Sequence, residues 1–282
     1  MRALKAKKLF TSAATFNFLV AFSLFGLSIS SQAQVINPIP VVNNDWRFSA
    51  SINGWAPASW VTASAGSLSK SADSSISDNI NSAGALAMLT GEAHKGDWGV
   101  MADLVYWQMG GNINKTTYHQ TSTDYTSLYA GINTKTTQTM LTMAGTYTAY
   151  KSDVLYIDAL AGARYISSTS SINATARVTN SPFTFSASGN QSFVNQTTDP
   201  LIGFKGRARI ADTSWFIPFY ADIGKGPGAN NTTWQTLLGV GNAYAWGDIT
   251  LAYRAMYFDL DSRVARTKFL NAGPQLAATL NF

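Results

Sequence analysis

Apolar residues recur at every second position along most of this chain, and that alternation constrains the fold more than any other feature. Between residues 98 and 107, one face would carry Trp98, Val100, Ala102, Leu104 and Tyr106. Residues 155–165 and 215–223 alternate in the same way. A period of two is typical of β-strands whose two faces meet different surroundings. The pattern therefore predicts an all-β fold with few helices.

The connections between these segments come in two sizes. Residues 95–97, 151–153, 211–213 and 246–248 have the composition of tight turns. Longer stretches rich in Ser, Thr, Asn and Gly separate them, at residues 58–82, 110–133, 168–198, 225–231 and 262–266, and we expect these to be loops. Short turns that alternate with long loops are typical of transmembrane β-barrels, whose periplasmic turns are short. A soluble lipocalin-like barrel, with its two faces exchanged, has the same period.

The first 33 residues have the organisation of a secretory signal peptide. Basic residues precede an apolar run at residues 18–29, and Ser31-Gln32-Ala33 is a small-x-small cleavage site. The run is shorter than the roughly 20 residues that a membrane-spanning helix needs. We therefore expect a cleaved signal peptide at residues 1–33, a short periplasmic segment at 34–44 and a barrel at 45–282.

Composition supports a membrane location and argues against nucleic-acid binding. Charged residues make up 12% of the chain, against roughly 25% in soluble domains. Four of the 20 basic residues lie in the signal peptide, so 16 remain against 15 acidic residues. A nearly neutral mature chain offers no basic surface for nucleic acid. The absence of cysteine excludes disulfides and cysteine-ligated metals.

The number of strands should be even, because both ends of the barrel are expected at the periplasmic side. The alternating segments predict ten strands, at residues 45–56, 84–93, 98–109, 134–150, 154–167, 199–210, 213–224, 232–245, 248–261 and 268–282. Residues 60–69 also alternate, so twelve strands are the alternative if residues 71–82 contain another. Eight strands would result if the weakest segments are not strands.

Aromatic residues indicate which face meets lipid. Trp234 and Tyr244 share a face ten residues apart, about 25 Å of height on a tilted strand, which matches the apolar band of such barrels. We predict aromatic girdles at the two membrane interfaces, formed by Trp98, Tyr106, Tyr165, Trp215, Trp234 and Tyr244. The alternative is that these are core aromatics of a soluble barrel.

The opposite faces carry nearly all strand charges, so these would point into the lumen. The predicted lumen charges are Arg47, Glu92, Asp103, Asp158, Arg164, Lys205, Arg207, Arg209, Asp222 and Arg254. They would either form ion pairs that fill a narrow barrel or line a narrow channel. Lys205, Arg207 and Arg209 in succession would give such a channel a weak anion preference. A wide porin is not expected, since small barrels are filled by their own side chains.

Two further functions remain open. The long loops at residues 110–133 and 168–198 could recognise a ligand, a phage or a host surface. A lipid-modifying or proteolytic barrel would need His94 or His119 as its base. His119 has Ser122 and Asp124 nearby but no known motif, so we expect a protein that is not an enzyme. No histidine pair has metal-ligand spacing, and no cofactor is expected.

The C-terminus resembles that of bacterial outer-membrane proteins, because alternating apolar residues end at Phe282. This resemblance implies that the barrel-assembly machinery recognises Phe282, that signal peptidase cleaves the leader, and that outer-membrane lipid and lipopolysaccharide surround the barrel. The chain is also similar to a widespread proteobacterial family of outer-membrane barrels of unsettled function. The similar phrases are residues 95–99, 102–106, 160–165, 221–224 and 233–241, with Tyr253-Arg254 and Gly273-Pro274. That family implies a fold and an outer-membrane location but no chemistry.

Overall fold

The structure is a computed structural model that describes residues 35–65, 68–120, 125–180, 183–227, 231–261 and 266–282. Residues 35–282 form one compact unit. The predicted signal peptide, residues 1–33, lies outside the described residues.

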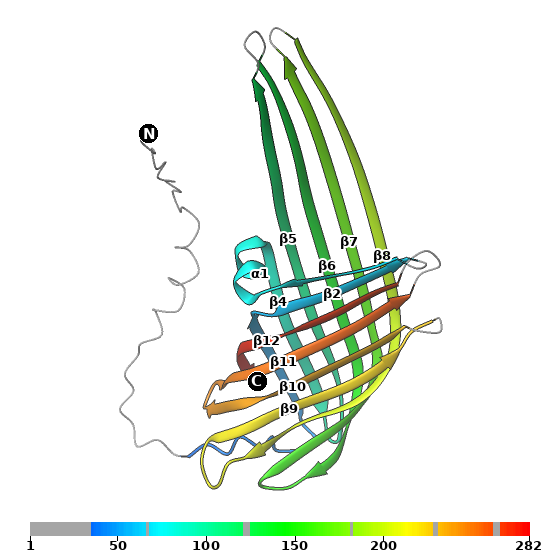
Figure 1. Ribbon diagram of the computed structural model, residues 1–282. Helices are drawn as coiled ribbons and strands as arrows, with labels where there is room; N and C mark the ends of the chain where they lie inside the picture. Colours follow the sequence, from blue (N-terminus) through cyan, green and yellow to red (C-terminus); the bar gives the residue numbers. More distant parts are fainter. Residues whose placement is uncertain (1–34, 66–67, 121–124, 181–182, 228–230, 262–265) are drawn as a thin grey trace, which may run out of the picture. The chain divides into compact units, whose positions relative to one another are not determined.

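Ten antiparallel strands close into a barrel (Figure 1). The ring runs β1, then β4 to β12 in chain order, and pairing of β1 with β12 closes it. Its strands are β1 (Trp46–Trp55), β4 (Ala83–Lys95), β5 (Trp98–Gln120), β6 (Tyr125–Lys151), β7 (Leu155–Asn180), β8 (Phe183–Arg209), β9 (Trp215–Lys225), β10 (Thr232–Tyr244), β11 (Gly247–Asp261) and β12 (Arg266–Asn281). The predicted barrel of ten strands is confirmed.

Two further strands, β2 (Ala58–Ala65) and β3 (Leu68–Ser74), do not enlarge the ring. Trp55 pairs with Gln275 and Ala58 with Ala272, so β1 and β2 follow β12 in one unbroken register. The amide of Ala56 donates to the carbonyl of Pro274 between them. The alternation at residues 60–69 therefore belongs largely to an upward prolongation of the first barrel strand. Strand β3 folds back on β2, and the short helix α1 (Ile76–Ser82) leads to β4.

The register gives the tilt of the strands. Starting at Ser49 and moving once around the ring from partner to partner, the path returns to the first strand at Val61, twelve residues further along. The path runs through Glu92, Met101, Ala144, Gly162, Leu201, Gly224, Thr233, Phe258 and Phe269. Ten strands with this stagger tilt by about 40° to the barrel axis. Each residue therefore adds about 2.5 Å of height.

Three of the four tight turns lie where the sequence predicts them, whereas β10 and β11 are joined at residues 245–246 and Asp248 already belongs to β11. The predicted connection at residues 225–231 separates β9 from β10, and residues 262–265 lie outside the described residues, but the other long connections differ from the prediction. Gly96 has a φ of 60° in the turn between β4 and β5, a conformation that glycine adopts without strain. The stretches predicted as loops at residues 110–133 and 168–198 are mostly strand. Strands β5 and β6 continue to Gln120 and from Tyr125, and β7 and β8 continue to Asn180 and from Phe183.

These prolonged strands form one four-stranded sheet above the ring, which we call the extension. It begins at the row of partners Met109, Thr136, Ser170 and Phe193 and comprises residues 109–120, 125–136, 170–180 and 183–193. Figure 1 shows the four strands rising together, well past the ends of β9 to β12. The prediction of loops was wrong because a polar composition hid the alternation of Leu128, Ala130 and Ile132 on β6.

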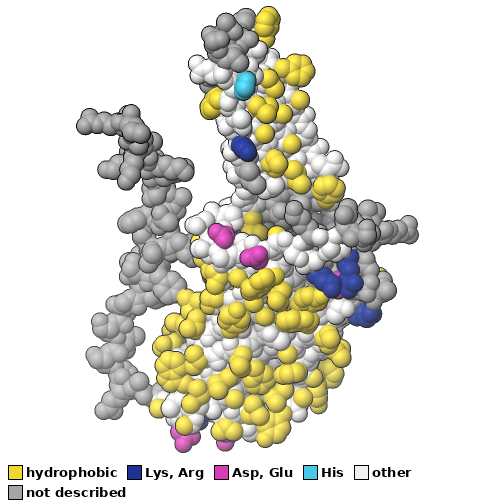
Figure 2. Space-filling view, viewed as in Figure 1, with side chains coloured by type: hydrophobic (Ala, Val, Ile, Leu, Met, Phe, Trp, Pro, Cys, Tyr) yellow, Lys and Arg dark blue, Asp and Glu magenta, His cyan; other side chains and the backbone are white. Residues whose placement is uncertain are grey.

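The outer surface of the barrel is apolar, as Figure 2 shows. Trp98, Trp215 and Tyr244 lie near the short turns and are 69%, 49% and 43% exposed. Tyr106, Tyr165 and Trp234 lie on the same outer face toward the extension, and the ring of Trp234 stacks on Tyr257 at 5.8 Å. Within the described ranges, no helix has the length and apolarity of a membrane span.

Candidate functional site

The middle of the lumen is closed by two buried ion pairs. Both side chains of the Arg164–Asp222 pair have 0% exposure. Arg164 donates from Nη1 to Oδ1 of Asp222 at 3.0 Å and from Nη2 to Oδ2 at 2.5 Å. Tyr220 donates its hydroxyl to the same carboxylate. Arg254 donates to Asp103 through Nη2 alone, and both of these side chains are buried.

Uncharged polar groups join the two pairs into one layer. The side-chain oxygen of Gln235 accepts from Nη2 of Arg164 at 3.2 Å and from Nη2 of Arg254 at 3.1 Å. Thr142 and Thr233 accept the remaining donors of Arg164. Buried charges are costly unless they are paired and hydrogen-bonded. Arg164 meets that requirement in full, whereas Nε of Arg254 is buried without a hydrogen-bond partner among the described residues. Both arginine side chains are buried.

An apolar layer lies above the ion pairs, toward the extension. The indole rings of Trp55 and Trp107 stack at 5.7 Å inside the lumen. The buried side chains of this cluster are Trp55, Met88, Val105, Trp107, Met140, Ile166, Met256, Phe258 and Leu260, with Phe269 packed against them. Because the apolar layer and the ion pairs are both buried, side chains fill the lumen at these two levels.

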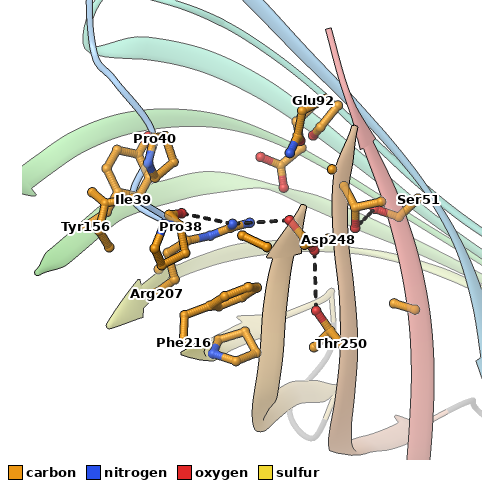
Figure 3. Close-up of a pocket in the computed structure, with 18 of the residues that line it drawn as sticks. Pro38, Ile39, Pro40, Ser51, Glu92, Tyr156, Arg207, Phe216, Asp248 and Thr250 are labelled. Carbon is orange, nitrogen blue, oxygen red and sulfur yellow. Dashed lines mark hydrogen bonds and ion pairs between the residues drawn. The ribbon is translucent and has the colours of Figure 1, made fainter. Parts of the chain in front are cut away.

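Below the ion pairs, the lumen widens into a cavity of about 610 Å³ that is lined by residues at the turn end of the strands. We call it the vestibule. Part of its wall is the segment Ile36–Pro40, which precedes the first strand (Figure 3). Nη1 of Arg207 donates to the carbonyl of Pro38 at 3.1 Å and to Oδ2 of Asp248 at 3.2 Å. Residues 36–40 of the predicted periplasmic segment at 34–44 therefore line the vestibule.

The vestibule also holds a second group of paired charges. Lys205 pairs with Glu92, and its Nζ lies 3.7 Å from Oδ2 of Asp158. Nε2 of His94 lies 3.2 Å from Oε2 of Glu92. Arg209 lies at the rim, where Nη1 is 3.8 Å from the exposed carboxylate of Asp212. The predicted succession of Lys205, Arg207 and Arg209 is therefore neutralised by carboxylates.

The structure places most of the predicted lumen charges in these groups. It brings together Arg164 with Asp222, Arg254 with Asp103, and Lys205 with Glu92 and Asp158. Arg47 lines the vestibule, where its buried Nε and Nη2 atoms have no hydrogen-bond partner among the described residues. Arg209 belongs to the turn rather than to the interior network.

Sequence reasoning missed several residues of the interior. Asp248 was assigned to a turn, and His94 was placed beside one, yet both side chains are buried. Gln235 carries no charge, so a search for charges could not find it. The available signal was the alternation of side chains along each strand. Asp248 is an even number of positions from Arg254, and Gln235 is an even number of positions from Thr233, so each faces inward with its neighbour.

The extension has an apolar inner face and a polar outer face. The inner face continues the lumen side of β6, β7 and β8, and it carries Leu128, Ile132, Ile172, Val178 and Phe185, each at least 40% exposed. The outer face carries polar residues such as Asn114 and Tyr129, which are hydrogen-bonded to each other at 2.9 Å. In the barrel below, the apolar face points outward, so the polarity of the two faces reverses where the extension begins.

The residues considered for enzymatic or metal chemistry do not form a described site. His119 lies near the tip of the extension and pairs with Thr126, while Ser122 and Asp124 lie outside the described residues. His94 is at the opposite end of the barrel, within the vestibule. In the part of the chain that the structure describes, no group of three His, Cys, Asp or Glu residues could hold a metal ion.

Phe282 closes the ring at its last residue. Its amide and carbonyl exchange hydrogen bonds with Phe48, and the two rings stack at 6.0 Å. The ring of Phe282 is 71% exposed on the outer surface. The C-terminal residue is thus part of the seam between the first and last strands.

No protein-family model matches the chain, and no curated protein matches it in sequence. Among solved structures, it is similar to the outer membrane protease OmpT from Escherichia coli, with 10% identity and a TM-score of 0.48 over 88% of this chain and 100% of that one. The attachment invasion locus protein Ail of Yersinia pestis matches with 9% identity and a TM-score of 0.30, over 82% of this chain and 98% of that one. A Pseudomonas aeruginosa FadL homologue matches with 8% identity and a TM-score of 0.30, over 84% and 90%.

The location follows from the barrel itself. Its ring is closed, its outer surface is apolar between two levels of aromatic side chains, and the strand charges between these levels point inward. A closed barrel leaves no unpaired strand edge, and it is the form in which β-strands cross a membrane. The protein is an integral β-barrel of the bacterial outer membrane.

Proposed function

We propose that this protein is a non-enzymatic recognition protein of the cell surface, in which the barrel is a closed anchor and the extension is the binding part. The observation that carries this proposal is the extension itself, four strands with an exposed apolar face beyond the ring. Large exposed apolar patches in soluble surroundings mark sites of interaction. With the short turns on the periplasmic side, this face lies outside the cell.

The closed lumen argues against the pore interpretation. A channel needs a continuous path for water, and the side chains of Arg164 and Asp222 have no solvent-accessible surface. The three cations that suggested an anion preference all have carboxylate partners. The purified protein should therefore give no reproducible single-channel steps in planar bilayers.

The direct test is removal of the extension. Residues 112–133 and 171–192 would each be replaced by a tight turn, joining Gly111 to Thr134 and Ser170 to Phe193, which are neighbouring partners in the register. Cells that display the intact or the shortened protein would be compared for retention on an apolar abiotic surface, on immobilised extracellular-matrix protein and on a layer of their own kind. We expect the intact protein alone to increase retention on at least one of these.

The shortened protein must still fold for this comparison. Heat-modifiable migration on gels would show that it does, since the ring below the extension keeps all its strands. Equal retention of both cell types on all three surfaces would refute the recognition function. An assayed lipase or protease activity that His119→Ala abolishes would replace it with an enzymatic one. Membership in the widespread proteobacterial family, and contacts with lipopolysaccharide and the assembly machinery, stay predictions.

A further inference from the structure

The inner face of the extension is built in rows of apolar side chains. One row consists of Leu128, Val178 and Phe185, which are partners in the register. The next row toward the barrel consists of the small residues Ala130, Ala176 and Ala187. Ile132 and Ile172 follow below. The large side chains are thus separated by a row of small ones across the middle strands.

Nothing in the described chain covers this face. Phe185 is 77% exposed, and Val178 and Leu128 are 41% and 47% exposed. Apolar side chains gather on the upright sheet in Figure 2, which is viewed from the side where β9 to β12 lie in front. Apolar surface left in water forgoes about 25 cal/mol per Å² of stabilisation. A sheet with both faces in water gains nothing by concentrating its apolar residues on one of them unless a partner covers that face.

The dimensions of the face fit a protein-sized partner. Four strands spaced by about 4.8 Å and prolonged by about eleven residues of 3.3 Å each give an area of roughly 700 Å². A standard stable interface buries about 800 Å² on each partner. Two such faces packed on each other would therefore reach the usual size of a stable interface.

The charge of the face restricts the chemistry of that partner. The described charged residues of the extension are Lys115, Lys135 and Arg177. Lys135 and Arg177 share the strand parity of the polar outer face, whereas Lys115 lies on the inner side of the edge strand β5, as the partner of Ala130. Within the extension, the inner positions of β6, β7 and β8 carry no charge among the described residues. The part of the face on β6, β7 and β8 is thus uncharged and complementary to itself, with Lys115 at its edge, and two such faces pack about 10 Å apart, as in a β-sandwich.

The position of the face decides how two copies could meet. The inner face continues the lumen side, so it points across the mouth of its own barrel. Ten tilted strands make a ring about 20 Å across. If two copies in one membrane placed these faces 10 Å apart, each barrel would lie on the side its face points toward, and the two barrels would overlap. Copies that stand in opposite membranes have their barrels at opposite ends of the paired sheets and do not collide.

We propose that the inner face of the extension binds the same face of a second copy anchored in another membrane, so that the protein joins cells of the same kind. This inference rests on the proposed recognition function and names its partner. The pairing would be antiparallel, with the tip of each extension near the mouth of the opposite barrel.

Tethering of vesicles tests the proposal. Two populations of phosphatidylcholine vesicles with different fluorophores would carry the full-length mature protein, and a third population would carry none. We expect protein-bearing vesicles to associate with each other and not with the bare ones. If two protein-bearing populations stay apart, or if protein-bearing and bare vesicles associate equally well, the proposal is overturned, and in the second case the face binds lipid instead.

Matched substitutions on adjacent residues locate the contact. Val178→Lys and Phe185→Lys place a charge on the inner face, whereas Thr179→Lys and Ser186→Lys place it on the outer face of the same strands. We expect the inner variants to lower tethering about tenfold or more, because a charge buried without a partner is costly, and the outer variants to leave it unchanged. Equal effects of inner and outer variants would contradict the proposal. Heat-modifiable migration checks that all four fold.

The cell assay separates this inference from the proposed function. If intact cells are retained through the extension on the abiotic or matrix surface but not on their own kind, recognition stands and self-association is wrong. If the extension changes retention on none of the surfaces, the recognition function itself fails.

Discussion

Arg164 and Asp222 show why single residues in the lumen have large effects. Their side chains have no solvent-accessible surface, and the pair is bidentate. Removing one partner of a buried pair leaves an uncompensated charge, which typically costs about 3–5 kcal/mol. Replacing both by apolar residues of similar volume is often nearly neutral. The stabilising effect of the pair therefore depends on both members being present.

We expect Arg164→Met to lower the free energy of unfolding by about 3–5 kcal/mol, measured by urea titration of the protein in lipid vesicles with tryptophan fluorescence. The double variant Arg164→Met/Asp222→Leu should recover most of that loss. Lys151→Ala is the control, because its ion pair with Asp97 is half-exposed and such pairs contribute at most about 1 kcal/mol. A single variant as stable as the wild type would contradict this interpretation.

Asp78 gives a pH-dependent element outside the membrane. Hydrogen bonds from the hydroxyl and the backbone amide of Ser75 hold the pKa of its carboxyl below the ordinary value. A lowered pKa in the folded state means that the bonds stabilise α1 above the ordinary pKa of about 4 and lose this effect as the pH falls through the folded value. The protection of the amides of residues 76–82 against hydrogen exchange, relative to the intrinsic exchange rate at each pH, should therefore fall below pH 4. In Asp78→Asn, which cannot ionise, this protection should not change with pH.

Parity predicted which charges point inward, but it could not predict their partners. Asp222 and Arg164 lie 58 positions apart, and the registers of β7 with β8 and of β8 with β9 bring them together. Arg254 and Asp103, 151 positions apart, meet across the lumen only because the ring closes with a stagger of twelve residues. The stagger depends on the register of every strand pair, which the sequence does not specify. The partner of Arg207 could not be predicted either, because Asp248 lay in a segment that was interpreted as a turn.

At the scale of elements, the first barrel strand is the feature that the sequence described least well. It continues from β1 into β2 along β12, and only its lower half pairs with β4. Pro57 stands between the two halves, and proline within an alternating run normally indicates the end of a strand. The register with β12 nevertheless continues past it, because neighbouring residues supply the hydrogen bonds.

Helix α1 lies in the gap that the upper half of this strand leaves. Asn79 is buried, and its Nδ2 donates to the carbonyl of Pro57 and to Oγ of Ser59, both at 2.8 Å. We expect Asn79→Ala to release α1 and to expose residues 76–82 to proteases on intact cells. Asn81→Ala, at an exposed position of the same helix, is the matched control. Cleavage that is equally slow in both variants would show that Asn79 does not hold the helix.

The extension was missed because composition and alternation gave opposite indications. Residues 168–198 are rich in Ser, Thr and Asn, which favour loops, and alternation of Ile172, Ala174, Ala176 and Val178 was not weighed against them. Threonine is also a good strand former because it is branched at Cβ. The pairing of β6 with β7 along their whole length favours the strand over the loop, because the backbone groups of each strand are then hydrogen-bonded to the other.

At the scale of the whole molecule, the lumen has two compartments with different access. The vestibule lies below the ion pairs, and the apolar layer with Val105 lies above them. A chain without cysteine makes this arrangement testable with single cysteines and a membrane-impermeant maleimide. Ser51→Cys lines the vestibule, Val105→Cys lies in the apolar layer, and Ser186→Cys lies on the extension.

Each position should then react from one side or not at all. On intact cells, we expect the reagent to label Ser186→Cys alone, because the extension is outside and both lumen levels are closed to it. After the outer membrane is permeabilised, Ser51→Cys should react as well, at a rate limited by the segment Ile36–Pro40 in the vestibule wall. Deleting residues 36–40 should accelerate that reaction without producing conductance, because the ion pairs and the apolar layer still close the barrel. Labelling of Val105→Cys from either side would mean that a path crosses these layers, and the anchor would then also be a channel.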